Sequence, residues 1–306
     1  MSWSRRMNSS QQEDWKFGVI SQILLGLAKN ELLKNVLIFK GALILNEYLP
    51  TKRKSLDIDS NLADEFLVDH PTRETREAFL REQFERAISR HFEAQNPVRY
   101  ELMSLKFELS PRAYHPHGWD GFLVTVTVKD HEKEGVRGLP KLTIDIAAPE
   151  ALSERSVTNI DYRGVEIRAY SLERVTGEKA RAYLSTLPAY CAKMGKIRDT
   201  VRAKDLYDLA QIHRIKPLSC TEFWKIAGDE FKLACESRYV DCFGLESFRE
   251  RWEETRAVFE KSPVIPRDIS FENVTSSIEA ISSYWQRIGI IPFAFPLLKN
   301  KDPYPS

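Results

Sequence analysis

The sequence has few of the features that would place a protein in an oxidising compartment or draw it to a polyanion through bulk charge. Only four of its 306 residues are cysteine, all in the C-terminal half, and their spacing lacks the short paired intervals of a structural zinc site. We therefore expect free, buried thiols at Cys191, Cys220, Cys235 and Cys242. The formal net charge is only +1, so attraction to a polyanion must come from a local patch.

Long apolar runs are also missing. The most apolar early stretch, residues 19–28, has about half the length of a membrane span and includes Ser21 and Gln22. The opening residues, MSWSRRMNSSQQEDWK, contain no continuous apolar segment behind the two arginines, which argues against a secretory signal. These features predict a cytoplasmic protein with no membrane partner.

The composition is that of a folded protein, because 42% of the residues are apolar and 29% are charged. A chain of this length can form one large domain or two of ordinary size. The pattern of the sequence changes near residue 170, so we expect two domains, residues 1–170 and residues 171–306.

The N-terminal part mixes helical spacing with short runs that are rich in β-branched and aromatic residues, which predicts an α/β or α+β fold. The expected elements are a helix (15–33), a strand (36–39), a helix after Gly41 (42–49), a strand (55–62), a helix (71–94) and four strands (98–110, 121–129, 141–148 and 164–170). The C-terminal part is expected to be helical, over 172–187, 199–213, 219–236, 244–261 and 273–286.

Two acidic side chains stand one residue apart in the expected strand SLDIDSNL. Since side chains alternate between the faces of a strand, Asp57 and Asp59 point the same way while Leu56 and Ile58 point into the core. Two carboxylates this close repel each other unless a cation neutralises them, and Mg²⁺ is a suitable hard cation. A solvated edge strand with two exposed acids is the alternative.

A third acid follows the same pattern in KLTIDIAA. There Leu142, Ile144 and Ile146 share one face, and Asp145 lies on the other. If this strand pairs beside residues 56–62, Asp145 completes a group of three carboxylates that could hold two metal ions for a phosphoryl displacement. Asp145 could equally be a surface acid.

The glycine before the second helix offers a place for an anion. Gly41 and Ala42 begin a helix directly after a strand, so unpaired backbone N–H groups and the helix dipole could bind a triphosphate. A glycine at such a position can also serve only as a turn residue.

Together these segments resemble the nucleotidyltransferase superfamily and, more narrowly, the AbiEii/AbiGii-type toxins of type IV toxin–antitoxin systems, including MenT-like relatives. The stretch FKGALILNEYLPTKRKSLDIDSNL has the spacing of that family, with Arg53 and Ser55 at the positions of its arginine and its Ser or Thr. Ala42 departs from the pattern, because the family usually has Gly or Ser there. The resemblance implies that Gly41, Ala42, Arg53 and Ser55 contribute to nucleotide binding.

The resemblance resumes after the strands. SLERVTGEKARAYL is similar to the family segment that carries an essential lysine, here Lys179, and RAKDLYDLAQI to its R-D-x-x-D helix, here with Lys204 before Asp205 and Asp208. A lysine keeps the charge of the family's arginine but not its bidentate fork. The matched segments are residues 36–62 and 141–212.

Helical geometry draws attention to the same lysine independently. The apolar stripe of the helix that starts near Leu172 defines its inner face, and Lys179 falls in the middle of that stripe. Its ammonium could reach the carboxylates and a bound phosphate, or its stem could run to the rim. The neighbouring Glu178 is expected to be solvated.

The next helix carries charges that have two interpretations. Asp205 lies within the arc marked by the apolar residues, and Asp208 lies at its edge, so both could face the site or could pair with basic neighbours. Residues 193–216 contain seven Lys or Arg against three Asp, which suits a polyanionic acceptor such as tRNA but also an ordinary solvated face.

The family resemblance implies a specific function. It is the transfer of a nucleoside monophosphate from an NTP to an acceptor, with Mg²⁺ or Mn²⁺ as cofactor. It also implies a toxin with a cognate antitoxin, a role in phage defence, and the tRNA 3′ end as acceptor. The expected catalytic residues are Asp57, Asp59, Asp145, Lys179, Asp205 and Asp208, the first three of them metal ligands. Nucleotidylation of a protein or a small molecule, and a catalytically silent nucleotide-binding module, are the alternatives.

Overall fold

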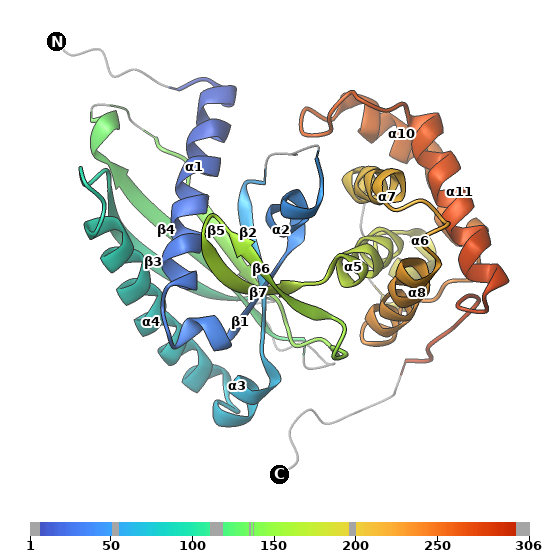
Figure 1. The fold of residues 1–306 in the computed structure, drawn as a ribbon, viewed down its shortest axis with the longest axis horizontal. Helices are drawn as coiled ribbons and strands as arrows, with labels where there is room; N and C mark the ends of the chain where they lie inside the picture. The colour runs from blue at the N-terminus through green and yellow to red at the C-terminus, as the bar shows by residue number, and fades with distance from the viewer. Residues whose placement is uncertain are drawn as a thin grey trace.

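The computed structural model describes residues 7–50, 55–110, 119–134, 136, 138–195 and 200–297. Within these ranges, a mixed sheet of seven strands forms the centre of the N-terminal part (Figure 1). The strands are β1 (Leu37–Lys40), β2 (Asp57–Leu62), β3 (Tyr100–Ser110), β4 (Gly121–Asp130), β5 (Leu142–Ile146), β6 (Val157–Tyr162) and β7 (Val165–Tyr170). Their order across the sheet is β3-β4-β5-β2-β1-β7-β6.

Helices cover the sheet and then form the C-terminal part. Those that precede or interrupt the sheet are α1 (Ser9–Ala28), α2 (Gly41–Tyr48), α3 (Asp64–Asp69) and α4 (Arg73–Glu93), with short 3-10 turns η1 (Leu33–Asn35) and η2 (His131–Lys133). Those that follow it are α5 (Leu172–Leu184), α6 (Pro188–Lys193), α7 (Ala203–Ile215), α8 (Thr221–Glu236), α9 (Leu245–Arg249), α10 (Trp252–Lys261) and α11 (Phe271–Arg287).

Two hydrophobic cores hold these layers together. In the first, apolar side chains of α1 and α4, such as Ile23 and Phe84, pack with Val124 and Ile144 of the sheet. The second lies among the C-terminal helices around Trp224 and extends to α2 and β7. Figure 1 shows α1 and α4 together on one side of the sheet and the C-terminal helices, α5 among them, as a separate group beyond α2. The mixed α/β sheet followed by helices confirms the predicted fold class.

The strands that carry the acidic residues are central neighbours. β2 pairs antiparallel with β1 on one side and parallel with β5 on the other. In this register Asp59 lies opposite Lys40 across one pairing and opposite Asp145 across the other. The predicted pairing between the strand of Asp57 and the strand of Asp145 is thereby confirmed.

Several element boundaries differ from the prediction for local physical reasons. The first helix begins at Ser9 and not near residue 15, because Asn8 and Gln11 form a capping box that satisfies the first N–H groups. The expected helix over 244–261 is two helices, α9 and α10, separated by two residues. The prediction also missed α3, α6 and β6, which are short elements with weak periodicity.

Three of the four cysteines are buried, as the sequence predicts. Cys191, Cys235 and Cys242 are buried free thiols, whereas Cys220 is partly exposed, so the prediction of burial fails for that residue. Among the helices of the described ranges, none combines the length and the apolar character that crossing a membrane requires.

Candidate active site

The turn between β1 and α2 requires glycine at position 41. Gly41 has a φ of +76°, a left-handed conformation that other residues adopt only with strain. A Cβ atom placed there would lie 1.8 Å from Oδ2 of Asp59, so the same position also brings backbone and carboxylate into close contact. The N-cap residue of α2, Lys40, provides no side-chain cap. The helix therefore presents its first N–H groups beside Asp59, as an anion site requires.

Three carboxylates lie along β2 and β5 near this turn. Asp57 and Asp59 are two residues apart on one face of β2, and Asp145 is the register partner of Asp59 on the parallel strand β5. Neighbouring strands are about 4.8 Å apart, so the side chains of a register pair emerge next to each other. Residues that are far apart in the sequence are thus brought together at one end of the cavity described below.

Burial and electrostatic repulsion together raise the pKa of two of these acids. Burial and the negative charges of Asp57 and Asp145 raise the pKa of Asp59 to about 6, although Lys40 and Lys179 act in the opposite direction. The pKa of Asp145 is also raised, because the surrounding protein limits its hydration and Asp57 lies nearby. A cation between these groups would relieve the repulsion.

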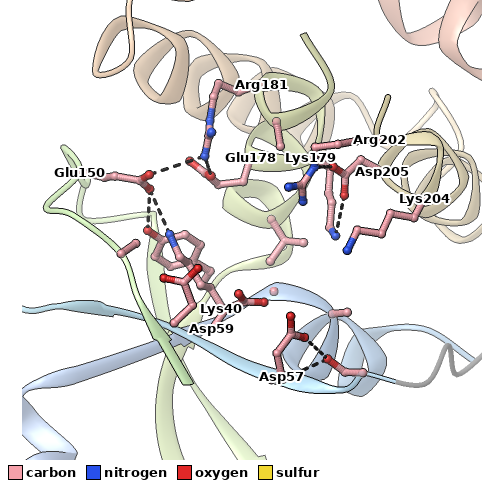
Figure 2. Close-up of a pocket in the computed structure, with 18 of the residues that line it drawn as sticks. Lys40, Asp57, Asp59, Glu150, Glu178, Lys179, Arg181, Arg202, Lys204 and Asp205 are labelled. Carbon is pink, nitrogen blue, oxygen red and sulfur yellow. Dashed lines mark hydrogen bonds and ion pairs between the residues drawn. The ribbon is translucent and has the colours of Figure 1, made fainter. Parts of the chain in front are cut away.

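The same three acids are the candidate ligands of a metal ion. Within the described ranges, no group of three or more His, Cys, Asp or Glu side chains is gathered closely enough to hold a metal ion as it stands. The Asp57 carboxylate is instead engaged by Ser55, whose Oγ donates to Oδ1 and to the backbone oxygen of Asp57 at 3.2 Å (Figure 2). The donor chemistry fits a hard divalent cation, since all three groups are carboxylates, and burial together with the charges of the other two raises the pKa of Asp59.

Lys179 faces this cavity from the opposite wall. It projects from the buried face of α5, and its Nζ lies 3.1 Å from Oδ1 of Asp205 and 2.7 Å from Oδ2 of Asp208. Asp205 also forms an ion pair with Arg202. Burial alone would raise the pKa of Asp205, but the charges of Arg202 and Lys179 hold it below its usual range. The lysine is therefore buried with two acidic partners and does not snorkel to the rim.

A second ionic network closes the back of the cavity around Glu150. Its carboxylate lies 3.4 Å from Nζ of Lys40, 3.0 Å from Arg238, 3.5 Å from Arg174 and 3.6 Å from Arg181. These cations hold the pKa of Glu150 well below its usual range despite its burial. The network connects the sheet to α5 and to Arg238, two residues after the end of α8.

The cavity between these walls has a volume of about 500 Å³, which is within the range of small-ligand pockets. It brings together eight of the residues predicted from the sequence: Gly41, Ala42, Ser55, Asp57, Asp59, Asp145, Lys179 and Asp205. Asp208 contacts Lys179 but is not among the described residues that line the cavity. Arg53 lies outside the described residues.

The expectation for Glu178 was wrong. It lines the cavity, its side chain is only 13% exposed, and it pairs with Arg174 and Arg181. Residues 174, 178 and 181 have the i, i+4, i+7 spacing of one helical face, so the sequence contained the signal. Lys40, Glu150 and Arg238 also line the cavity and were missed.

The arrangement suits the transfer of a phosphoryl-containing group. A helix N-terminus and Lys179 can hold phosphate oxygens, and three carboxylates on neighbouring strands can hold cations and take up a proton. A strand, a glycine turn, a helix and a pair of acidic strands follow one another in the order that the resemblance to nucleotidyltransferases implies.

The sequence matches the family described as nucleotidyl transferase AbiEii toxin, type IV TA system, over residues 22–288. The chain therefore belongs to this family of nucleotidyltransferase toxins, and membership implies an NTP substrate and an antitoxin partner. The match agrees with the resemblance predicted from the motifs.

Two solved structures are similar to the chain over most of its length. One is a crystal structure assigned as a nucleotidyltransferase from H. pylori, with 15% identity, 92% of this chain and 98% of that chain covered, and a TM-score of 0.49. The other is MenT4, a nucleotidyltransferase toxin from Mycobacterium tuberculosis H37Rv, with 14% identity, 90% and 85% covered, and a TM-score of 0.45. No curated protein matched the sequence.

Proposed function

We propose that this nucleotidyltransferase toxin moves a nucleoside monophosphate from an NTP to the 3′ end of tRNA, in a reaction that depends on Mg²⁺ or Mn²⁺. The observation that carries the proposal is the position of Asp59. It lies between Asp57 and Asp145, beside the uncapped start of α2, in a cavity whose opposite wall holds the buried Lys179. We further propose that residues 1–170 and 171–306 act as two domains that provide the two walls.

Asp57, Asp59 and Asp145 are the residues that would hold the divalent cations. When bound, such ions neutralise phosphate oxygens and lower the pKa of a coordinated hydroxyl group. The raised pKa of Asp59 supports this assignment, because it follows from burial and from the charges of Asp57 and Asp145, and a bound cation would offset both effects.

The protein's own groups would bind and orient the two substrates. The N–H groups at Gly41 and Ala42, with Lys179 and Arg53, would hold the triphosphate. Asp145 would accept the proton of the acceptor hydroxyl. The acceptor oxygen then forms a bond to the α-phosphorus, the bond from that phosphorus to the bridging oxygen breaks, and pyrophosphate leaves.

Asp205 and Asp208 would contribute by holding the side chain of Lys179 in place. Asp205 and Asp208 hold its Nζ from one side, at 3.1 and 2.7 Å, so the ammonium is fixed within the wall of the cavity. The basic residues of 193–216 include Arg202 and Lys204, which line the cavity and would attract a polyanionic acceptor.

Incubation of total RNA with each labelled NTP and Mg²⁺ tests the proposal. Wild-type protein should label tRNA with one preferred nucleotide, and nuclease should remove the label. Asp57→Ala should abolish labelling, whereas Asp229→Ala, which removes an exposed carboxylate of α8, should not. Label that survives nuclease but not protease would indicate a protein acceptor.

The alternative of a silent binding module gives a different result. In that case no acceptor is labelled, and the Asp57→Ala protein retains its effect on growing cells. If the protein is an enzyme, Asp57→Ala should abolish the labelling and the toxicity together. Co-expression of the antitoxin with the wild-type protein should restore growth.

A further inference from the structure

Glu150 is buried among four cationic side chains, and other acids already neutralise two of them. Its exposed fraction is 6%. Two of its four cationic partners have other acids at shorter distances: Arg174 lies 3.1 Å from Glu178 and 3.2 Å from Glu230, and Arg181 forms an ion pair with Glu178. Burying a carboxylate is costly, and a buried ion pair often adds little stability. The partners that depend most on Glu150 are therefore Lys40 and Arg238.

Two carboxylates, those of Asp59 and Glu150, lie near the side chain of Lys40. It is the register partner of Asp59 across the antiparallel pair of β1 and β2, where side chains of opposite residues are about 5 Å apart at Cβ. Its Nζ nevertheless lies 3.4 Å from Oε2 of Glu150 and 5.4 Å from the ring centre of Tyr170 (Figure 2). Considering only the described part of the chain, Lys40 forms its ion pair with Glu150 and none with Asp59.

An ammonium group that paired with Asp59 would occupy the place of a cation. Tyr170 helps to prevent this, because its ring lies against the ammonium and its hydroxyl donates to Glu150 at 3.2 Å. The other side of Glu150 is fixed by Arg238, which also donates to the backbone oxygen of Ala148 at 3.0 Å. The carboxylate that attracts Lys40 is thus itself held in place.

On this basis, which rests on the proposed function, we infer that Glu150 is a positioning residue: it keeps the ammonium group of Lys40 away from Asp59 and so leaves that carboxylate available to a divalent cation. Without Glu150, Lys40 turns toward Asp59 and competes with the metal ion. Glu150 thus acts on metal affinity mainly through Lys40, although its charge also reaches Asp145 directly and it is not itself a ligand.

Binding of Mn²⁺ in the absence of nucleotide, followed by electron paramagnetic resonance, tests the inference. Glu150→Gln should weaken Mn²⁺ binding about tenfold, because one close ion pair changes a binding constant by roughly that factor. Glu178→Gln is the matched control, since it removes the same charge from the same cavity without an ion pair to Lys40. It should leave the affinity within about threefold of wild type.

The effect must also depend on Lys40. In the Lys40→Met background, adding Glu150→Gln should change Mn²⁺ affinity by no more than the roughly threefold expected for the loss of one charge from the cavity, because the competing ammonium is gone. A loss of similar size with and without Lys40, or equal losses for Glu150→Gln and Glu178→Gln, would overturn the inference.

Two further variants keep the outcome interpretable. If Glu150→Gln does not fold, Glu150→Asp takes its place; it retains the charge but withdraws the carboxylate from Lys40, and should weaken Mn²⁺ binding in the same direction. Unchanged binding there would overturn the inference as well. Failure of the proposed function has a different signature, since Asp59→Asn would then bind Mn²⁺ as tightly as wild type.

Discussion

Replacement of Gly41 by alanine should disable the enzyme while the protein remains folded. Two effects act at this position. The φ of +76° costs a residue with a Cβ atom about 1–2 kcal/mol. The new methyl group would also lie 1.8 Å from Oδ2 and 2.7 Å from Cγ of Asp59, so that the carboxylate must move by more than about 1 Å to reach an allowed contact.

The two effects have different consequences. Backbone strain and local overpacking together should lower the free energy of unfolding by about 2–4 kcal/mol, less than the roughly 5–15 kcal/mol that stabilises a typical protein. Displacement of Asp59 by about 1 Å should reduce nucleotide transfer by about a hundredfold, because catalytic geometry tolerates little error. Activity should therefore fall far more than stability.

A matched control separates strain from displacement. Gly138 has the same φ of +76°, but a Cβ atom there would meet nothing within 4 Å. Gly138→Ala should lower the melting temperature and leave the transfer rate within about twofold of wild type. The reasoning is refuted if Gly41→Ala, measured well below its melting temperature by transfer of labelled nucleotide, is as active as Gly138→Ala.

Three further predictions concern stability. The folded state raises the pKa of Asp59 to about 6, so the metal-free protein holds this proton more tightly than the unfolded chain does. As the pH rises from 4 to 6, the free energy of unfolding should therefore fall by up to about 3 kcal/mol. Denaturant titrations of Asp59→Asn should lack the part of this loss that comes from Asp59. Gly177→Ala should destabilise the protein by about 1–3 kcal/mol, since its Cβ atom would lie 2.5 Å from the backbone of α8. Gly18→Ala should stabilise the protein slightly, since a Cβ atom there would meet nothing within 4 Å. The two variants should therefore shift the melting temperature in opposite directions. Asp205→Asn should cost about 3 kcal/mol, because it leaves the buried Lys179 with one acidic partner fewer, and calorimetry showing no change would contradict the assigned ion pairs.

The residues predicted from the sequence were those whose geometry is local. Period-two alternation indicates that Asp57 and Asp59 share a face, and helical periodicity indicates that Lys179 lies on the buried side of its helix. Pairing of the two acidic strands was a conditional prediction, because register depends on contacts across the whole sheet. The structure supplies that register, with Asp59 beside Asp145.

The residues that were missed owe their position to contacts between distant segments. Glu150 follows the end of β5 in an irregular segment, and Arg238 follows α8, so neither belongs to a periodic pattern that would place its side chain. Lys40 was passed over although it precedes the glycine, because its importance comes from the strand opposite. Only Glu178 could have been placed correctly, since its spacing from Arg174 and Arg181 defines a helical face.

The two ionic networks explain how one cavity can hold opposite charges without collapsing into internal salt bridges. Lys179 is held from its own side by acids of α7, and Lys40 is held by Glu150, so neither ammonium group pairs with the carboxylates of β2. The acids of β2 and β5 consequently remain close to one another, and burial together with their mutual repulsion raises the pKa of Asp59. A polyanionic nucleotide that arrives with divalent cations would satisfy both walls at once, the carboxylates through the metal and the lysine through phosphate. The protein thus keeps its carboxylates close together and fixes its cations beforehand, which is the preorganisation that the proposed transfer between two anionic substrates would require.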